Sequence, residues 1–284
     1  MSAVPLKVQD QPREADFSFD AADFERVRTL IYRKAGISLH AGKQAMVYSR
    51  LSRRLRELGH DSFASYLHWL EQARGAQAET EWQEFINCLT TNLTSFFRED
   101  HHFPVLAEEL LRRKGRPTRV WCNAASTGEE PYSLAMTALE ALGARPNVSI
   151  LCSDIDTKVL ARAEQGVYDH GARGIDAERL RRHFLRGTGG NDGFIRVRPE
   201  LRELVRFRPF NLMDAQWTSL GEPFDIVFCR NVMIYFDPAT QRGVLERMHR
   251  AMVPGGLLFA GHSENFGDSK DLFRLRGKTV YERA

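Results

Sequence analysis

Two adjacent carboxylates, Glu129 and Glu130, follow a turn of small residues within the segment Arg119–Ser133. An apolar run precedes this turn and an apolar-periodic segment follows it, which predicts a strand, a tight turn and a helix. Pro131 fits an early helical position, where its missing N–H costs little. Small residues let a ligand approach the backbone, and a helix start offers free N–H groups that favour phosphate. Two acids at that place favour instead a ligand with an ammonium or sulfonium charge.

A further acid, Asp154, ends the next predicted strand. An acid at that position commonly binds ribose hydroxyls in dinucleotide folds. Aspartate can also cap the following helix, but Asp156 is the natural capping residue here, so Asp154 is the better ribose candidate. The first turn lacks the GxGxxG pattern, which favours a nucleoside without a pyrophosphate. The chain has no GxxxxGK[ST], HExxH or GxSxG motif, and its histidines lack metal-ligand spacing.

Other polar segments fall where ligands of a parallel sheet bind. Asn211-Leu212 and Arg230–Tyr235 each follow an apolar strand-like run, at the predicted carboxyl edge of the sheet. The segment Thr90–Glu99 joins two regions of different character and contains polar groups, a Phe pair and one arginine. It could be only a linker and a helix cap, or it could contribute to a site above the sheet.

The composition of the 284-residue chain, 43% hydrophobic and 27% charged, is typical of a soluble protein with one or two domains. A net charge of +3 does not by itself indicate nucleic-acid binding. Four cysteines without CxxC or Cys/His spacing predict buried, reduced thiols in a cytoplasmic protein. No apolar run approaches the roughly 18 residues of a membrane span, so we expect no membrane insertion. Residues 1–16 are expected to be a flexible lead-in, because they lack the apolar core of a signal peptide.

Residues 17–90 carry only helical signals and predict an all-α N-terminal domain. We expect four helices, which begin near Asp20, Gly42, Asp61 or Ser62, and Thr80. The second helix has an apolar stripe on one face and a group of arginines on the other, namely Arg50, Arg53, Arg54 and Arg56. Such a face is either simply solvated or a docking surface for an acidic partner.

Strands and helices alternate from residue 116 to residue 284, after an interdomain segment and linker helix over 91–115. The predicted strands cover residues 119–124, 148–155, 206–211, 224–231, 256–260 and 278–283. The predicted helices cover residues 129–142, 158–165 and 240–252. This alternation predicts an α/β domain with a parallel sheet, helices on both faces and ligands at the carboxyl ends of the strands.

One interval, about 166–206, breaks the alternation. It contains a basic helix over 177–185, a glycine-rich turn and two strand-like runs over 194–198 and 204–207. We expect an inserted β-hairpin subdomain. Its glycines could serve only the turn, or the exposed edge of the hairpin could capture an extended peptide by adding a strand.

Five segments together resemble the CheR family: TTNLTSFFRE, WCNAASTGEEPYS, SDIDTKVL, FDIVFCRNVMIYFD and GGLLFAGHSE. Members of that family are S-adenosylmethionine-dependent methyltransferases that esterify glutamates of bacterial chemoreceptors. The motifs stand in family order and span roughly residues 17–282. The resemblance implies an all-α N-terminal domain and a Rossmann-like methyltransferase domain with a small inserted antiparallel β-subdomain. It also implies a protein-glutamate O-methyltransferase that serves receptor adaptation in chemotaxis.

The resemblance further assigns residues to the cofactor S-adenosylmethionine and its product S-adenosylhomocysteine, with no metal. The matching residues are Asn92, Thr94, Arg98, Ala125, Glu129, Asp154, Asn211, Leu212, Arg230 and Asn231. Glu129 matches the acid that holds the methionine ammonium group, with Glu130 as the alternative. Arg98 and Tyr235 match residues that position the substrate carboxylate beside the methyl group.

The implied partner is the helical cytoplasmic domain of a chemoreceptor, whose acidic side chains suit the arginine helix. In some family members the hairpin also binds a short peptide at the receptor C-terminus. The residues that stand where that contact would be made are Gly187, Gly189, Gly190, Gly193 and Arg196. We expect the protein to act as a monomer.

Two other interpretations fit the sequence less well. A methyltransferase of nucleic acid would normally carry an Asn/Asp-Pro-Pro-aromatic motif, which the chain lacks, and a more basic surface. A signalling module that keeps the fold but has lost activity would be expected to lack some cofactor residues, and all of the candidates are present.

Overall fold

The computed structural model describes residues 17–284, so the prediction for residues 1–16 lies outside the described part of the chain. The N-terminal domain contains α1 (Ala21–Ala35), the short 3-10 helix η1 (Ala41–Lys43), α2 (Gln44–Leu58), α3 (Phe63–Gln72) and α4 (Ala76–Leu89). As predicted, Asp20 caps α1, and Ser62 caps α3. Helix α4 begins before the predicted Thr80, at Ala76. These helices enclose a core of their own, which includes Val47, Leu51, Phe63 and Phe85.

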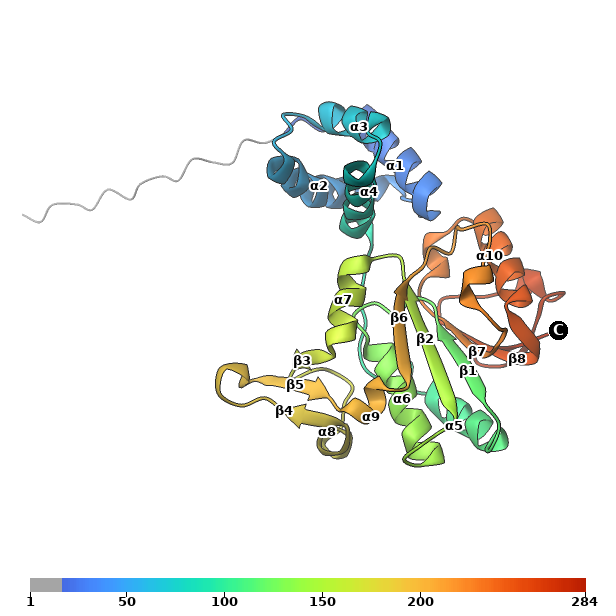
Figure 1. Ribbon diagram of the computed structural model, residues 1–284. Coiled ribbons are helices and arrows are strands. Elements are labelled where there is room, and N and C mark those ends of the chain that lie inside the picture. The colour runs from blue at the N-terminus through green and yellow to red at the C-terminus, as the bar shows by residue number, and fades with distance from the viewer. Residues whose placement is uncertain (1–16) are drawn as a thin grey trace, which may run out of the picture.

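A seven-stranded sheet forms the second domain, in the order β6-β2-β1-β7-β8-β10-β9 (Figure 1). Its strands are β1 (Thr118–Cys122), β2 (Val148–Asp154), β6 (Val205–Pro209), β7 (Phe224–Cys229), β8 (Met252–Ala260), β9 (Phe273–Gly277) and β10 (Val280–Arg283). The first five strands run parallel, and β10 pairs antiparallel with both β8 and β9. All six residues of β7 are buried, as expected for a central strand covered on both faces.

Helices cover both faces of this sheet. On one face lie α5 (His102–Arg112) and α6 (Glu129–Leu142), whose apolar residues form one core with Val120, Ile150 and Phe228. On the other face lies α10 (Pro238–Arg250), which forms a second core with Trp121, Val227 and Leu258. Helix α7 (Thr157–Gln165) follows β2. Asp156 caps α7 by accepting the N–H groups of Lys158 and Val159, which confirms its predicted capping role.

A separate three-stranded sheet projects from the side of the domain, with the antiparallel order β3-β5-β4 (Figure 1). It contains β3 (Val167–Asp169), β4 (Phe184–Arg186) and β5 (Phe194–Val197), together with α8 (Ala177–His183) and α9 (Pro199–Arg202). The predicted helix over 177–185 was too long, because Phe184 already pairs with Val197. The run 204–207 was wrongly placed in this hairpin. It belongs to β6, where Val205 pairs with Ile150 of the main sheet.

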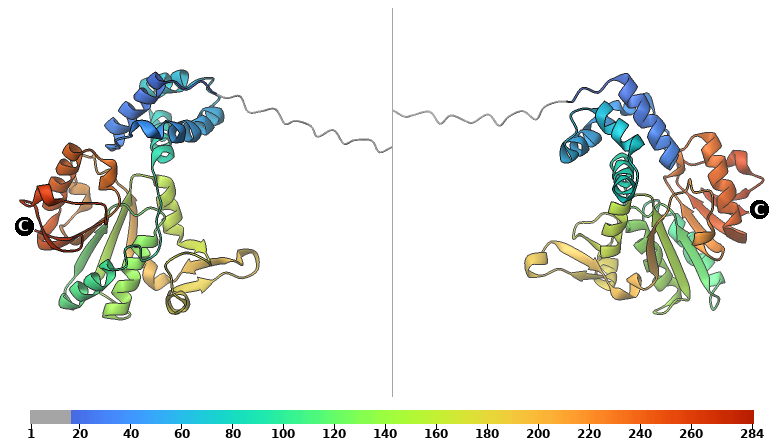
Figure 2. Two further views of the ribbon diagram at one scale, coloured as in Figure 1. Left: turned by 180° about the vertical axis from the view of Figure 1, so that it is seen from behind. Right: turned by 45° about the horizontal axis from the view of Figure 1, so that its top comes forward.

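The helical N-terminal domain lies beyond the carboxyl ends of the parallel strands (Figure 2). Hydrogen bonds join it to the loops there, from the Ser38 N–H to the Tyr235 carbonyl (2.8 Å) and from the Asn211 amide to the Lys34 carbonyl (2.7 Å). The predicted fold class is confirmed: an all-α domain precedes a mostly parallel sheet with a small antiparallel insertion. In the described part of the chain, no helix is both long enough and apolar enough to span a membrane.

Candidate functional site

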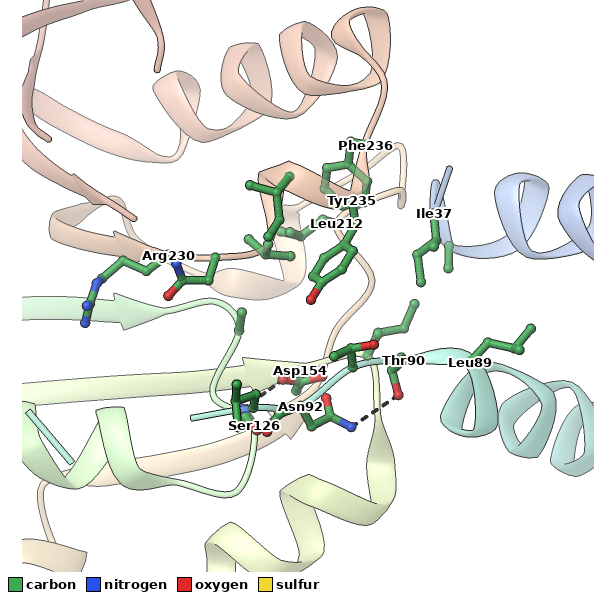
Figure 3. Close-up of a pocket in the computed structure, with 18 of the residues that line it drawn as sticks. Ile37, Leu89, Thr90, Asn92, Ser126, Asp154, Leu212, Arg230, Tyr235 and Phe236 are labelled. Atoms are coloured by element: carbon green, nitrogen blue, oxygen red, sulfur yellow. Dashed lines mark hydrogen bonds between the residues drawn. The ribbon is translucent and has the colours of Figure 1, made fainter. Parts of the chain in front are cut away.

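A pocket of about 270 Å³ lies between the helical domain and the carboxyl edge of the sheet. Its sheet side is built by the turn after β1, the end of β2 and the loops after β6 and β7. Its other side comes from residues 35–46 and from the interdomain segment after α4. Figure 3 shows Asp154 and Tyr235 on opposite sides of this pocket, with Asn92 and Ser126 beside Asp154. The sequence analysis had placed ligands at this edge of the sheet.

Asp154 is a buried carboxylate that lines the pocket at the end of β2. Its Oδ2 accepts the Ser126 N–H (2.8 Å) and its Oδ1 accepts the Asp156 N–H (2.9 Å). Burial raises its pKa to about 6, although these backbone donors act in the opposite direction. Each carboxylate oxygen has a second lone pair, so Asp154 can still accept hydrogen bonds from a pair of hydroxyl groups.

The turn after β1 lets the backbone approach a ligand. Ala124 and Ser126 line the pocket, and Ser126 adopts a left-handed conformation with φ 47°. Ala125 does not line it, because its side chain is fully buried and its N–H donates to the Ser153 carbonyl. Ala124 and Ser126, rather than Ala125, therefore border the pocket in this turn. Gly128 has φ 99°, and a Cβ there would lie 2.6 Å from the Tyr168 hydroxyl, so the turn requires glycine.

The structure separates the two adjacent glutamates at the start of α6. Glu130 lines the pocket, where its Oε2 accepts a hydrogen bond from Arg230 Nη1 (2.6 Å). Glu129 lies outside this pocket and accepts a hydrogen bond from the Thr127 hydroxyl (2.7 Å) in a separate depression beside β3. Consecutive helical residues point about 100° apart, so they cannot share one site easily. Both Glu130 carboxylate oxygens already have partners, Arg230 and the Cys122 thiol, so Glu129 stays the predicted acid for an ammonium group, with Glu130 as the alternative.

Arg230 connects the acids beneath the pocket. Its side chain is 1% exposed and pairs with Glu130 and, at 3.4 Å, with Glu99. In Figure 3 its guanidinium points away from Asp154 and Tyr235. Burial opposes ionisation of Glu99, but hydrogen bonds from His262 and the charge of Arg230 lower its pKa to about 2. Arg230 thus lines the site while its charge is compensated by two carboxylates.

Glu99 also approaches two histidines. One carboxylate oxygen of Glu99 and one ring nitrogen each of His101 and His102 lie within 4.8 Å of one another, a spacing at which such atoms could hold a metal ion. The Glu99 carboxylate already accepts hydrogen bonds from His262 and Asn231, and the Arg230 guanidinium lies beside it. A cation next to the carboxylate opposes metal binding, so this cluster is better described as part of the ion-pair network.

The interdomain segment lines the pocket through Asn92, Thr94 and Arg98, three of the residues that the resemblance assigns to the cofactor. The Asn92 amide donates to Asp156 Oδ2 (2.8 Å), and the Asn92 carbonyl accepts the Ser126 hydroxyl (2.9 Å). This segment is therefore fixed to both the turn after β1 and the end of β2.

Arg98 and Tyr235 both line the pocket, on segments that are far apart in the sequence. The Arg98 side chain donates to the Leu93 carbonyl (2.9 Å), and no ion pair to a carboxylate is recorded for it among residues 17–284. Tyr235 ends the short 3-10 helix η4 (Met233–Tyr235) in the loop after β7. The structure thus brings together a hydroxyl and a guanidinium that could both approach an anionic ligand.

The remaining predicted residues Asn211, Leu212 and Asn231 also line the pocket. Asn211 Oδ1 accepts the Met213 N–H (2.9 Å), so this side chain mainly holds its own turn and the helical domain. Sequence reasoning missed the helical-domain side of the pocket, which includes Ile37, Leu39, His40 and Lys43. No local pattern marks these residues, because only the packing of the two domains brings them to the site.

The four arginines of α2 have different roles. Arg54 forms an ion pair with Glu81, whose side chain is 3% exposed, and Arg50 donates to the Thr90 carbonyl (2.6 Å) at the end of α4. Both hold α2 to α4, so the expectation that all four arginines form one docking surface is corrected for these two. Arg53 has an 84% exposed side chain that pairs with Glu57, and Arg56 is exposed near the Phe17 ring.

The glycine-rich turn of the small sheet needs several of its glycines for geometric reasons. A Cβ on Gly187 would lie 2.0 Å from the Asn191 carbonyl oxygen, and Gly189 and Gly193 have positive φ. Gly190 has open space around it. Arg196 is exposed in the central strand β5 between Val167 and Leu185, which it faces across the two strand pairs. The small sheet therefore presents a mixed apolar and cationic face.

Comparison with known proteins gives a consistent result along the whole described chain. Residues 22–90 match the family model described as CheR methyltransferase, all-alpha domain, and residues 92–282 match CheR methyltransferase, SAM binding domain. The chain is 53% identical to a chemotaxis protein methyltransferase of Escherichia coli, over 92% of this chain and 90% of that protein. It is also 53% identical to chemotaxis protein methyltransferase 2 of Pseudomonas aeruginosa, over 95% of each.

Proposed function

The chain belongs to the CheR methyltransferase family, and on that premise we propose that it transfers a methyl group from S-adenosylmethionine to glutamate side chains of a chemoreceptor. The observation that carries this proposal is the pocket at the carboxyl edge of the sheet. It combines a buried acid at the end of β2, a second acid at the start of α6 and an arginine–tyrosine pair. The products are a glutamate methyl ester and S-adenosylhomocysteine.

The residues of the pocket fit such a cofactor in chemistry and arrangement. Asp154 would accept hydrogen bonds from the ribose hydroxyls, and Glu129, or alternatively Glu130, would hold the ammonium group of the methionine part. Thr94, Asn231 and the apolar side chain of Leu212 would line the remainder of the cofactor, together with Asn92 and Asn211. Acids rather than phosphate-binding glycines suit a ligand that carries a sulfonium and an ammonium charge.

The chemistry needs little activation of the nucleophile. S-adenosylmethionine supplies a methyl group on a positively charged sulfur, which is a good leaving group. A glutamate side chain is ionised at neutral pH, so no general base has to remove a proton. The protein then contributes alignment of the carboxylate oxygen with the methyl group and removal of water from that oxygen.

We assign this alignment to Arg98 and Tyr235. Each can donate a hydrogen bond to the acceptor carboxylate, and both line the pocket. One carboxylate oxygen must remain available to attack the methyl group, so a contact to Arg98 through a single oxygen suits the reaction better than a bidentate pair. No metal is required, because neither the nucleophile nor the leaving group needs a Lewis acid.

The direct test is transfer of a labelled methyl group to a chemoreceptor cytoplasmic fragment. We expect base-labile label on the receptor, as for a methyl ester, and no label on nucleic acid. Replacement of Tyr235 by Phe should lower kcat by about 10²-fold, the lower end of what a lost transition-state hydrogen bond costs. Its affinity for S-adenosylhomocysteine, measured by calorimetry, should stay unchanged. Absence of label with the wild-type protein would refute the function, and an unchanged rate in the variant would refute only the role of Tyr235.

Two surfaces are proposed to bind the receptor. Arg53 and Arg56 would face the acidic side chains of the receptor helices, since they are exposed on α2. The small sheet would bind a peptide at the receptor C-terminus by adding a strand at an edge, near the turn over 187–193 and Arg196. Such a tether raises the local concentration of substrate. Titration of a receptor tail peptide against the protein, with an Arg196→Ala variant beside it, tests the second surface.

A further inference from the structure

Glu264 lies in the loop after β8 and is 4% exposed. Its carboxylate accepts four backbone N–H groups. Oε2 accepts those of Gly261 and of Asn231 (3.0 Å), and Oε1 accepts those of Val232 (2.9 Å) and Met233 (2.8 Å). Three of these donors belong to the loop after β7, which is the neighbouring strand of the sheet. A single buried side chain thus anchors the start of a loop that forms one wall of the pocket.

The loop after β7 has little intrinsic reason to hold its shape. Asn231 has φ 58°, a left-handed conformation that non-glycine residues rarely adopt. The 3-10 helix η4 has only three residues, and no side chain of its own segment caps its N-terminus. The carboxylate of Glu264 replaces that missing cap from the adjacent loop.

The close approach of the two loops also explains Gly261. A Cβ at this position would lie 2.5 Å from Asn231 Nδ2, 2.9 Å from the Asn231 backbone nitrogen and 2.9 Å from Glu264 Oε2. At the other end of the loop, the Gln241 side chain donates to the carbonyls of Met233 (2.9 Å) and Phe236 (3.0 Å). Tyr235 therefore lies on a loop whose N–H groups are fixed by Glu264 and whose carbonyls are fixed by Gln241.

We propose that Glu264 is a positioning residue, which holds the loop over 231–235 against the pocket and so sets both cofactor affinity and the placement of Tyr235. It acts through Asn231 and Tyr235, since it does not itself line the pocket. For the rate of methyl transfer the inference rests on the proposed function. For the affinity of the pocket it requires only that the protein binds S-adenosylhomocysteine.

The test compares Glu264→Gln with Asp225→Asn. The amide of glutamine keeps the shape of the side chain but turns an N–H₂ group toward two of the four backbone donors. We expect about tenfold weaker binding of S-adenosylhomocysteine by calorimetry, because buried donors without an acceptor destabilise the arrangement that binds. Asp225 serves as the control. It is a buried carboxylate of β7, away from the pocket, that accepts the Arg119 N–H (2.8 Å) and pairs with Arg113. Its variant should lose at least as much thermal stability, because the pair with Arg113 is weakened too, and should keep wild-type affinity.

Normal affinity in Glu264→Gln with a stability loss like that of Asp225→Asn would overturn the inference. If Glu264→Gln does not fold, Gly261→Ala disturbs the same contact from the other side, and wild-type affinity in that variant would have the same consequence. In a Tyr235→Phe background, Glu264→Gln should lower kcat much less than it does in the wild type, and equal losses would refute action through Tyr235. Failure of the wild-type protein to bind S-adenosylhomocysteine would instead refute the proposed function.

Discussion

The arginine face of α2 and the acid-lined edge of the sheet are both clusters of like-charged residues, but they are held in different ways. At the sheet edge, Asp154 lies at the end of a parallel strand and is fixed by backbone N–H groups of the adjoining turns. On α2, neighbouring arginines have unrelated partners, a buried glutamate for Arg54 and a surface glutamate for Arg53. Topology therefore gathers the acids into one site, whereas helical periodicity divides the arginines between core and solvent.

The largest predicted effect is the difference in folding stability between variants of the buried-side and exposed-side arginines of α2. Replacement of Arg54 by Ala leaves Glu81 buried with the Tyr66 hydroxyl (2.8 Å) as its remaining side-chain partner among residues 17–284. We expect a loss of about 3–5 kcal/mol in the free energy of unfolding. Arg53→Ala removes an exposed pair and should change it by less than about 1 kcal/mol. Urea unfolding of the two variants measures both values. Equal losses would contradict the separation of the arginines into structural and surface groups.

A second contrast concerns the adjacent acids at the start of α6. Glu129→Gln should weaken binding of S-adenosylhomocysteine by about 10- to 100-fold, because it removes a charge-assisted hydrogen bond to the ammonium group of the ligand. Glu130→Gln is the matched variant and should weaken binding less, since this carboxylate is already paired with Arg230. Calorimetric titration of both variants decides between them, and the reverse order would make Glu130 the ligand-facing acid.

Much of the fold follows from local sequence patterns. The helix over Glu129–Leu142 begins and ends as predicted, because the turn, Pro131 and the apolar period agree with one another. The run 204–207 was misplaced since an alternating strand has the same local pattern in a hairpin as at the edge of a parallel sheet. Strand β9 (Phe273–Gly277) was missed, because the turn that joins it to β10, at Lys278 and Thr279, lacks the Asn-Gly type of sequence that marks a hairpin.

The candidate site was predictable to the level of segments but not always of side chains. Every strand end that was selected does reach the pocket, because parallel strands bring their carboxyl ends together. The sequence pattern leaves open which way α6 turns its first two acids, and the structure places Glu130 and Glu129 in different depressions. Likewise the partners of Arg50 and Arg54 lie in α4, a separate helix, so only the packed bundle shows that these arginines are structural.

Asp154 offers a pH test of the sheet edge. Because burial raises its pKa to about 6 and a ribose would bind the ionised form, affinity for S-adenosylhomocysteine should fall as the pH decreases through 6, by about tenfold between pH 7 and pH 5. Lower pH has the opposite effect on the folding stability of the ligand-free protein. A carboxyl whose pKa is raised above its unfolded value of 3.8 stabilises the fold at low pH, and this contribution is lost as the pH rises through about 6. Protonation of Asp154 does not destabilise the fold, so unfolding caused by that protonation would not explain weaker binding at pH 5. The variant Asp154→Asn should bind weakly at both pH values, without this pH dependence. A flat profile in the wild type would exclude Asp154 as the titrating contact.

The smallest effect is expected from the exposed arginines of α2. The double variant Arg53→Glu, Arg56→Glu should raise KM for the receptor fragment about fivefold at low salt, because charge complementarity at an exposed surface contributes roughly 1 kcal/mol. The effect should shrink toward 1 M salt, where the screening length falls to about 3 Å. Both kcat and the affinity for S-adenosylhomocysteine should stay unchanged, since neither residue lines the pocket. Arg274→Glu, Lys278→Glu carries the same change in net charge at exposed positions of the β9–β10 hairpin, in the other domain, and serves as the control. An equal rise in KM for this control would attribute the effect to overall charge, and the arginine face of α2 would then have no specific part in docking.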